Sequence, residues 1–499
     1  AAVSAATASS AATAVTAESA DSADSASSVP WSGVTGAPGF WRLGGNAGTD
    51  PLSDYIGTSD FTTLALRVDN RQVLRVIPSE DDDGFSPNLI GGHPENDVDE
   101  STDFDPPIVG AVIGGGGAAE FPNRVGADFA TVGGGGNNLA SVFGSVIGGG
   151  TGNVASANRA TVGGGLDNRA GANPFVGNYA TVGGGRDNEA TGDAATVGGG
   201  ENNKALKDFA TIAGGLDNEA DAEFGKWMTI SGGRENATSD DGATVGGGLG
   251  NTASGFSATV AGGVANEASG FRATIGGGSS NTASGRNATV GGGKDNAAVR
   301  FATVPGGFAN CAGGWNSMAM GTNAKVRPGS DPNDDSACDS LPSYPGGEGD
   351  TGTFVWADDS DADFVSTGSK QFLVRAAGGI GLNTNAPDAP LHLASENNWN
   401  LTNTEGDFKI GDDTYRFKLG VSLGGAGAGN VRLRAQGGTH NLILGSNETD
   451  VVKVNHVDGL DPMSDNAFSL GSSGARWKSV WATDGTINTS DARLKRDVA

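Results

Sequence analysis

Residues 160–170 read Ala-Thr-Val-Gly-Gly-Gly-Leu-Asp-Asn-Arg-Ala, and the chain repeats this phrase with small changes between residues 130 and 312. Position +1, counted from the Thr, is Val or Ile in every copy, positions +3 and +4 are Gly, and position +7 is Asn. A fixed short period is the signature of a stacked repeat. Counted from the Thr position (position 0), the twelve copies begin at residues 131, 146, 161, 181, 196, 211, 229, 244, 259, 274, 289 and 303.

One copy of the phrase has the features of a coil with two strands. Side chains alternate along a strand, so positions −1 and +1 share one face and the Thr points away from it. The Gly pair allows a tight corner with positive φ, and Asn at position +7 tolerates the left-handed region, which predicts a second corner there. We therefore expect an all-β fold, a stacked β-roll or β-helix with coils of about 15 residues that rise by about 4.8 Å each.

The hydrophobic core of such a stack is thin. Each coil contributes one Val or Ile, which is worth about 1.5–3 kcal/mol when it is buried. Ordering the backbone of about fifteen residues costs about 15–30 kcal/mol before hydrogen bonds are counted. Burial between copies of the chain would add to its stability, so we expect an obligate oligomer.

Composition limits the functions that are open to the chain. Glycine makes up 86 of the 499 residues and aromatic residues only 6%, so ordinary compact domains are not expected, although the regular Val and Ile argue against disorder. The formal net charge of −27 disfavours nucleic-acid binding. It is typical either of a halophilic source or of a soluble extracellular surface. No run of about 18 apolar residues occurs, so we expect no membrane insertion.

The expected organisation follows changes in composition along the chain. Residues 61–69 and 71–78 alternate apolar and polar side chains around the turn-forming pair Asp69-Asn70, which predicts a hairpin, and residues 87–92 and 110–117 look like irregular first coils. The first residue is Ala, so we expect a piece of a longer chain. The predicted segments are an Ala/Ser-rich stalk or linker at 1–28, an N-terminal β module at 29–107, a repeat shaft at 108–325, an acidic Pro/Asp loop at 326–350, small β modules at 351–462, a further β segment at 463–489 and a last segment at 490–499.

Two copies of the repeat are longer than the others. The extra residues fall at 171–179 and 221–227, in both cases after the Ala at position +9, so both loops are expected on the same edge of the stack. They carry Phe175, Tyr179, Phe224 and Trp227, which are candidates for contact with a partner. The alternative is packing, because position −2 is aromatic in five copies.

Other candidate sites are few. Cys311 and Cys338 are too few for a zinc site and form either a disulfide or two buried thiols. The acidic insert at 79–84 is a solvated loop or a structural calcium site. We find no catalytic triad, metal cluster or phosphate-binding loop in the sequence, so we expect no cofactor, and a structural or binding protein rather than an enzyme.

The C-terminal segment carries a resemblance to a known family. Residues 465–498, which include Gly-Ala-Arg-Trp-Lys-Ser-Val-Trp at 474–481 and Asn-Thr-Ser-Asp-Ala-Arg-Leu-Lys at 488–495, resemble the entry to the endosialidase-type intramolecular chaperone of viral tail fibres and tailspikes. The resemblance implies self-cleavage at the bond between Ser490 and Asp491. The chain nevertheless continues to Ala499, so either the cut lies elsewhere or release has not occurred. Residues 463–489 would then precede the chaperone, and residues 490–499 would begin it.

Other segments are similar to parts of viral and adhesive fibres. Residues 371–387 look like a module of fibre proteins with that chaperone, the Ala/Ser-rich start is similar to the shafts of phage side tail fibres, and the repeats resemble the β-roll heads of trimeric autotransporter adhesins. These resemblances imply a homotrimeric viral tail fibre on the extracellular virion tail, from a haloarchaeal tailed virus. Its expected partners are virion tail or baseplate proteins and a host surface glycan or surface-layer glycoprotein. The alternatives are a tailspike depolymerase that cleaves surface polysaccharide and a cellular trimeric adhesin.

Overall fold

The computed structural model describes residues 56–82, 84–98, 107–329, 338, 347–382 and 384–393, and six strands between residues 408 and 462. The predicted stalk at 1–28 and the junction of Ser490 and Asp491 lie outside the described residues. The fold is all-β, a β-solenoid of about 18 turns with coils of roughly 15 residues, as predicted. The chain divides into two compact units, Ala1–Ser280 (unit 1) and Asn281–Ala499 (unit 2).

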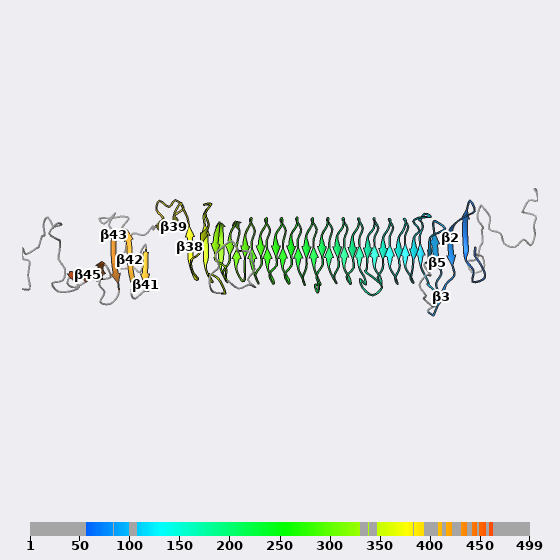
Figure 1. Cartoon of the computed structure of the whole chain (residues 1–499), viewed down its shortest axis with the longest axis horizontal. Helices are drawn as coiled ribbons and strands as arrows, with labels where there is room; N and C mark the ends of the chain where they lie inside the picture. Colours follow the sequence, from blue (N-terminus) through cyan, green and yellow to red (C-terminus); the bar gives the residue numbers. More distant parts are fainter. Residues whose placement is uncertain are drawn as a thin grey trace, which may run out of the picture. The chain divides into compact units, whose positions relative to one another are not determined.

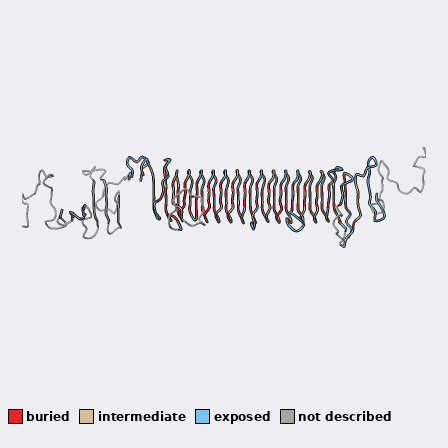
Figure 2. The backbone as a smooth tube through the Cα atoms, in the orientation of Figure 1, coloured by how far each residue is buried: buried red, intermediate tan, exposed pale blue. Residues whose placement is uncertain are grey.

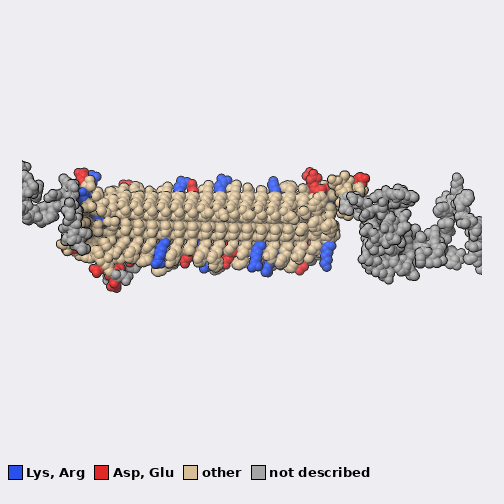
Figure 3. Space-filling model, turned by 180° about the vertical axis from the view of Figure 1, so that it is seen from behind, with Lys and Arg blue, Asp and Glu red and all other residues tan. Residues whose placement is uncertain are grey.

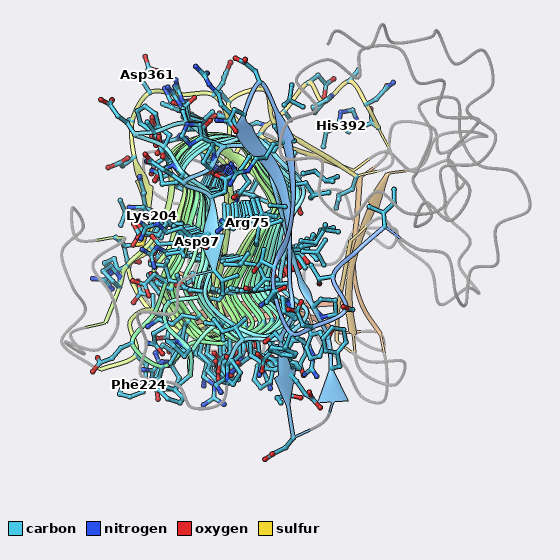
Figure 4. All side chains as sticks on the ribbon, turned by 90° about the vertical axis from the view of Figure 1, so that its right-hand side faces the viewer. Arg75, Asp97, Lys204, Phe224, Asp361 and His392 are labelled. Atoms are coloured by element: carbon cyan, nitrogen blue, oxygen red, sulfur yellow. A yellow bond between two sulfur atoms is a disulfide. The ribbon has the colours of Figure 1, made fainter. Side chains whose placement is uncertain are left out.

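Unit 1 begins with the predicted hairpin. Strands β1 (Leu64–Val68) and β2 (Arg71–Ile77) pair antiparallel, and Asp69 and Asn70 make the turn with φ of 47° and 56°. Strand β2 then pairs antiparallel with β5 (Asn88–Gly91), which runs parallel to β7 (Val112–Ile113), so the predicted first coils are confirmed. Strands β3 (Glu80–Asp81) and β4 (Gly84–Phe85) form a small side ribbon. At this end the Arg75 guanidinium donates to the Asn96 carbonyl and lies 3.2 Å from the Asp97 carboxylate (Figure 4).

Two sheets of parallel two-residue strands form the walls of the coils in unit 1 (Figure 1). We call the sheet of positions 0 and +1 the Thr sheet; β1, β2, β5 and β7 belong to it. Its other strands in unit 1 are β9 (Thr131–Val132), β11 (Val146–Ile147), β13 (Thr161–Val162), β15 (Thr181–Val182), β17 (Thr196–Val197), β19 (Thr211–Ile212), β21 (Thr229–Ile230), β23 (Thr244–Val245), β25 (Thr259–Val260) and β27 (Thr274–Ile275).

We call the sheet of positions +8 and +9 the Ala sheet. Each of its strands also pairs in register with the strand one coil away, as Arg169 pairs with Glu189. Its strands in unit 1 are β6 (Asp97–Val98), β8 (Arg124–Val125), β10 (Leu139–Ala140), β12 (Val154–Ala155), β14 (Arg169–Ala170), β16 (Glu189–Ala190), β18 (Lys204–Ala205), β20 (Glu219–Ala220), β22 (Ala237–Thr238), β24 (Thr252–Ala253) and β26 (Glu267–Ala268).

The core of the coils is a stack of small and branched side chains. Ala160, Val162 and Ala170 of one coil are fully buried, and their equivalents in the other coils are buried as well (Figure 2). The Thr at position 0 is partly exposed, as predicted from strand alternation. The backbone turns between strands at positions +4, +6 and −2, where Gly165, Asp167 and Arg159 have φ of 99°, 55° and 54°. A Cβ at Gly165 would collide with the carbonyl oxygen of Gly185 in the next coil, so only glycine fits there.

The Asn at position +7 does not make the second corner, and that interpretation of the sequence was wrong. The left-handed residue is the one before it, at position +6, and the Asn side chains point inward as a buried ladder. Asn203 Nδ2 donates to Asn188 Oδ1 at 3.0 Å and to the carbonyls of Gly199 and Gly215 at 3.0 and 2.9 Å. A buried amide is tolerated only when its polar atoms are paired, and stacking in register gives each Asn the same partners one coil away.

Unit 2 is built from strands of the same two kinds. Its Thr-sheet strands are β29 (Thr289–Val290), β31 (Thr303–Val304), β32 (Gly307–Phe308), β34 (Met318–Thr322), β36 (Phe354–Ala357) and β38 (Phe372–Arg375). Its Ala-sheet strands are β28 (Thr282–Ala283), β30 (Ala297–Ala298), β33 (Cys311–Ala312), β35 (Ala324–Val326) and β37 (Phe364–Val365).

The coil ladder extends beyond the predicted end of the shaft at residue 325. Strand β36 pairs parallel with β34, and β38 pairs parallel with β36, so residues 354–375 continue the Thr sheet of unit 2 and do not form a separate small module. The repeat phrase is lost there because the strands lengthen and take larger side chains, while the parallel register is kept. The remaining described strands are β39 (Ile380–Leu382), β40 (Leu391–Leu393), β41 (Phe408–Gly411), β42 (Arg416–Val421), β43 (Val431–Gln436), β44 (Leu442–Ser446), β45 (Thr449–Asn455) and β46 (Gly459–Pro462).

Candidate functional site

Both long loops leave the same edge of unit 1. Each connects a strand of the Ala sheet to the next strand of the Thr sheet: residues 171–180 join β14 to β15, and residues 221–228 join β20 to β21. Strands β14, β16, β18 and β20 are consecutive neighbours in the Ala sheet, so the two loops start three coil rises apart. Three rises amount to roughly 14 Å along the stack.

The loop at 171–179 is held by its own turn and by the next coil. The Phe175 N–H donates to Asn173 Oδ1 at 3.0 Å, which forms an Asx turn at the tip. Asp193 of the next coil accepts the N–H groups of Gly177 and Asn178, both at 2.9 Å. This framework leaves the Phe175 side chain 85% exposed at the tip of the loop.

Tyr179 belongs to the corner of the coil and not to the loop tip. Its φ of 60° places it in the left-handed region at position −2, and its side chain is 57% exposed. The Arg159 guanidinium of the previous coil donates to the Tyr179 hydroxyl at 3.0 Å and lies over its ring at 5.7 Å. The same guanidinium lies 5.4 Å from the ring centroid of Phe143, so Tyr179 is part of a column of stacked side chains.

The loop at 221–227 shows the same division between a tip and a corner. Phe224 is 84% exposed, and it points away from the coils at the periphery of the stack (Figure 4). Trp227 stacks on Phe209 of the previous coil, with a centroid distance of 5.8 Å and an interplanar angle of 10°. Of the four predicted contact residues, Phe175 and Phe224 are therefore presented to solvent, and Tyr179 and Trp227 also pack along the corner.

Ion pairs fix the base of the second loop. Lys226 Nζ lies 2.9 Å from Asp208, and Lys207 Nζ lies 3.2 Å from Asp221. The hydrogen bond from Lys226 is the largest cause of the lowered pKa of Asp208, and the same bond raises the pKa of Lys226. These two ion pairs therefore position the base of the loop.

Sequence reasoning missed part of the corner column. Phe143, Phe256 and Phe271 occupy position −3, one residue before the corner at position −2, and the rings of Phe256 and Phe271 stack with 5.1 Å between their centroids. Arg159 was missed because it stands where other coils have a ring. A search of position −3 for aromatic residues at the repeat period would have found the three phenylalanines.

The two cysteines lie in unit 2, where they are joined in a disulfide with 6.0 Å between their Cα atoms. The bond links β33 to the acidic Pro/Asp segment, and Cys338 is buried against Ala297 and Val299. Nearby, Arg327 makes a two-pronged contact with the fully buried Asp350 at 2.8 and 3.1 Å, and Ser366 also donates to this carboxylate. Covalent and ionic contacts thus tie this segment to the coils.

The described residues offer no cluster of three or more His, Cys, Asp or Glu side chains that could hold a metal ion. In the acidic insert, Asp81 accepts the Gly84 N–H at 3.1 Å. Over the residues that the structure describes, no helix has the length and apolarity needed to cross a bilayer. The geometry of the loops therefore supports surface contact.

Comparison with known proteins gives one partial similarity. No model of a protein family matches the chain. A stretch of 45 residues, 9% of the chain, is 58% identical to the side tail fiber protein pb1 of Escherichia phage T5. The chain spans only 3% of the length of that protein. Together with the β-solenoid, this similarity fits a tail-fibre-like protein.

Proposed function

We propose that this chain is the structural tail-fibre protein of a virus, that it acts as a homotrimer, and that it attaches the virion to the host cell surface. The observation that carries the proposal is the similarity to a phage side tail fiber protein in a chain that folds as a β-solenoid. A stack of uniform coils is a rigid spacer, because each coil contacts mainly its neighbours and adds the same rise. The fibre would belong to the virion tail and be held there by tail or baseplate proteins.

The edge loops of unit 1 are the proposed contact with the host. Phe175 and Phe224 are two exposed rings on one edge of the stack, on loops that start roughly 14 Å apart. A ring that is already exposed and held on an ordered loop can be buried by a partner at low entropic cost. We propose a host surface glycan or surface-layer glycoprotein as this partner. Three copies of each loop in a trimer would add avidity to weak single contacts.

The charge of the chain suits a saline environment. Three copies would carry three times −27, or −81 formal charges. Carboxylates at this density keep a surface hydrated, and salt screens their mutual repulsion. A haloarchaeal tailed virus is the source that we propose on this ground. The expected chaperone release at Ser490 is part of the proposal, and the intact mass of the purified protein tests it.

We propose attachment without catalysis. A depolymerase would need two acids at fixed separation across a groove, and coils built of Gly, Ala and Val give few side chains to build its walls. Release of oligosaccharide from host envelope glycan by the purified protein would favour the depolymerase. Detection of the chain on a cell surface, and not on virus particles, would favour a cellular adhesin.

The test of the contact loops uses whole particles. We expect the double variant Phe175→Ala, Phe224→Ala to lower the rate of adsorption to host cells without changing the melting temperature of the fibre. Phe121→Ala is the matched control, because Phe121 is 50% exposed in unit 1 but lies in neither loop. Equal adsorption by both variants would show that the loops are not the contact, and normal adsorption by particles that lack the protein would refute attachment itself.

A further inference from the structure

The outward face of the Thr sheet carries no charged residue along the coils of unit 1. Positions 0 and +2 point outward, and in the ten coils from Thr131 to Gly276 they hold Thr or Val and Gly, Ala or Ser. The outward position +8 of the Ala sheet, in contrast, holds charged residues in five of these coils: Arg169, Glu189, Lys204, Glu219 and Glu267. In Figure 3 the charged side chains gather along two long edges, and the band between them is uncharged. In a chain with 18% charged residues, an uncharged flat face indicates a constraint that the other faces do not have.

The same face becomes apolar in the first rungs of unit 1. Strand register aligns Leu64, Val76, Leu89 and Val112 with position 0 of the coils, which holds the Thr. It also aligns Leu66 and Leu74 with the outward position +2, where most coils have Gly. Leu66 and Leu89 remain 46% and 38% exposed, although apolar residues of this size are usually buried. The face is therefore incompletely covered where its side chains are largest.

The outward face of the Thr sheet in unit 2 has the same character. Thr303 is followed in register by Met318, Phe354 and Phe372, and the neighbouring column holds Met320, Trp356 and Val374. Phe354 and Phe372 stack at 4.8 Å, and Phe372 is still 75% exposed. Exposed apolar patches of this kind mark surfaces that are covered in the working protein.

A second copy of this chain is the partner that fits the face best. Its rungs have the same spacing, so two such faces match along the stack, and small side chains let the backbones approach closely. Copies that each carry a net charge of −27 repel one another, and the uncharged face brings the fewest charges together. Each rung offers about 4.8 Å by roughly 10 Å, or about 50 Å². The fourteen rungs of unit 1 therefore offer about 700 Å². This area lies within the range of about 600–1,000 Å² per partner that stable interfaces bury.

We infer that the outward face of the Thr sheet is the surface on which copies of this chain associate. The inference rests on the homotrimer of the proposed function and names its interface. It places the Ala sheet and the loop tips with Phe175 and Phe224 on the outside of the assembly, where they stay free to meet a host.

Cysteine variants of the full chain test the interface. Thr196→Cys places a thiol on the outward face of the Thr sheet, and Lys204→Cys places one on the Ala sheet of the same coil. The native cysteines are joined to each other and do not compete. With a short bismaleimide we expect Thr196→Cys to lose its 49.5 kDa band and gain bands of two and three chains, while Lys204→Cys stays a single chain. A monofunctional maleimide should label Thr196→Cys more slowly than Lys204→Cys.

The possible outcomes distinguish failure of the proposed interface from failure of the proposed homotrimer. Sedimentation of the unmodified chain as a monomer would refute the homotrimer and the interface together. An oligomer in which Thr196→Cys is labelled freely and is not cross-linked would overturn the interface and leave the homotrimer standing. An oligomer in which Lys204→Cys is cross-linked would place the contact on the Ala sheet. The charge variant Thr196→Asp, Thr211→Asp gives a second measurement, since we expect it to lower the sedimenting mass and, because burial between copies adds stability, the melting temperature as well. An unchanged sedimenting mass would overturn the interface.

Discussion

Substitution of one buried asparagine of the ladder should destabilise the stack far more than substitution of the asparagine next to it on the surface. In Asn203→Ala the lost side chain shares the two Nδ2 hydrogens among three acceptors, on Asn188, Gly199 and Gly215. Its Oδ1 accepts from the backbone and side-chain N–H groups of Asn218. The Asn218 N–H then loses its acceptor, Asn203 Oδ1, in a fully buried position. Loss of a buried partner costs about 1–3 kcal/mol for each orphaned group, so with the other lost bonds we expect about 3–5 kcal/mol.

The neighbouring residue supplies the control. Asn202 has the same side chain, lies at the corner, and donates to Asp217 at 2.6 Å on the surface. Ala265 and Ala309 occupy the same corner position with φ of 52° and 53°, so alanine is accepted there. We expect Asn202→Ala to cost at most about 1 kcal/mol.

Denaturant unfolding of the two variants and the parent, followed by circular dichroism, measures the difference. Because a repeat stack opens locally, amide hydrogen exchange of the coils from 188 to 218 should show the same ranking. Asn203→Asp distinguishes the loss of hydrogen bonds from the creation of a cavity. It keeps the volume of the side chain but places a second acceptor oxygen opposite the carbonyls of Gly199 and Gly215. Equal loss of stability in Asn203→Ala and Asn202→Ala would refute the argument that the ladder stabilises the fold.

Three further outcomes follow from the structure. Hydrogen bonds from Ser360, the Ala377 N–H and Arg375 lower the pKa of Asp358 to about 2, so the stability that this carboxylate contributes is present above pH 3.8 and is lost as the pH falls through about 2. Amide hydrogen exchange around β36 and β38, followed as the pH falls from 3.8 to about 2, measures this loss of stability. In Asp358→Asn this pH dependence should be absent. Reduction of the Cys311–Cys338 disulfide, which closes a separation of 27 residues, should lower the free energy of unfolding of unit 2 by about 3–4 kcal/mol, and unfolding with and without reductant checks this. Binding of isolated host envelope glycan to the fibre, measured by calorimetry, should weaken in the Phe224→Ala variant and be unchanged in Phe121→Ala.

The sequence alone determined the architecture of the coils. A strict period with Val or Ile at +1 and Gly at +3 and +4 can be satisfied by parallel strands stacked in register, and the alternation around Thr161 correctly placed Ala160 and Val162 inside. The hairpin was equally accessible, because Asp69 and Asn70 are neighbours in sequence and their turn is a local property. Features that depend on residues within one coil were therefore predictable.

The tertiary structure decided what depends on the relation between coils. Asn at +7 was interpreted as a corner residue because its backbone preference is local, whereas its partners, Asn188 and Asn218 around Asn203, lie fifteen residues away on either side. The continuation of the Thr sheet through Phe354 and Phe372 was hidden for the same reason, since parallel register survives where the sequence phrase does not.

The surfaces of the solenoid also required the fold. Tyr179 and Trp227 could be named from the sequence, but only the stacking shows that they pack along a corner while Phe175 and Phe224 stand free of it. The uncharged face is likewise invisible along the chain, because its residues come from strands that are about fifteen positions apart. A short period fixes how each coil turns, but the contacts that stabilise and cover the stack run perpendicular to the chain.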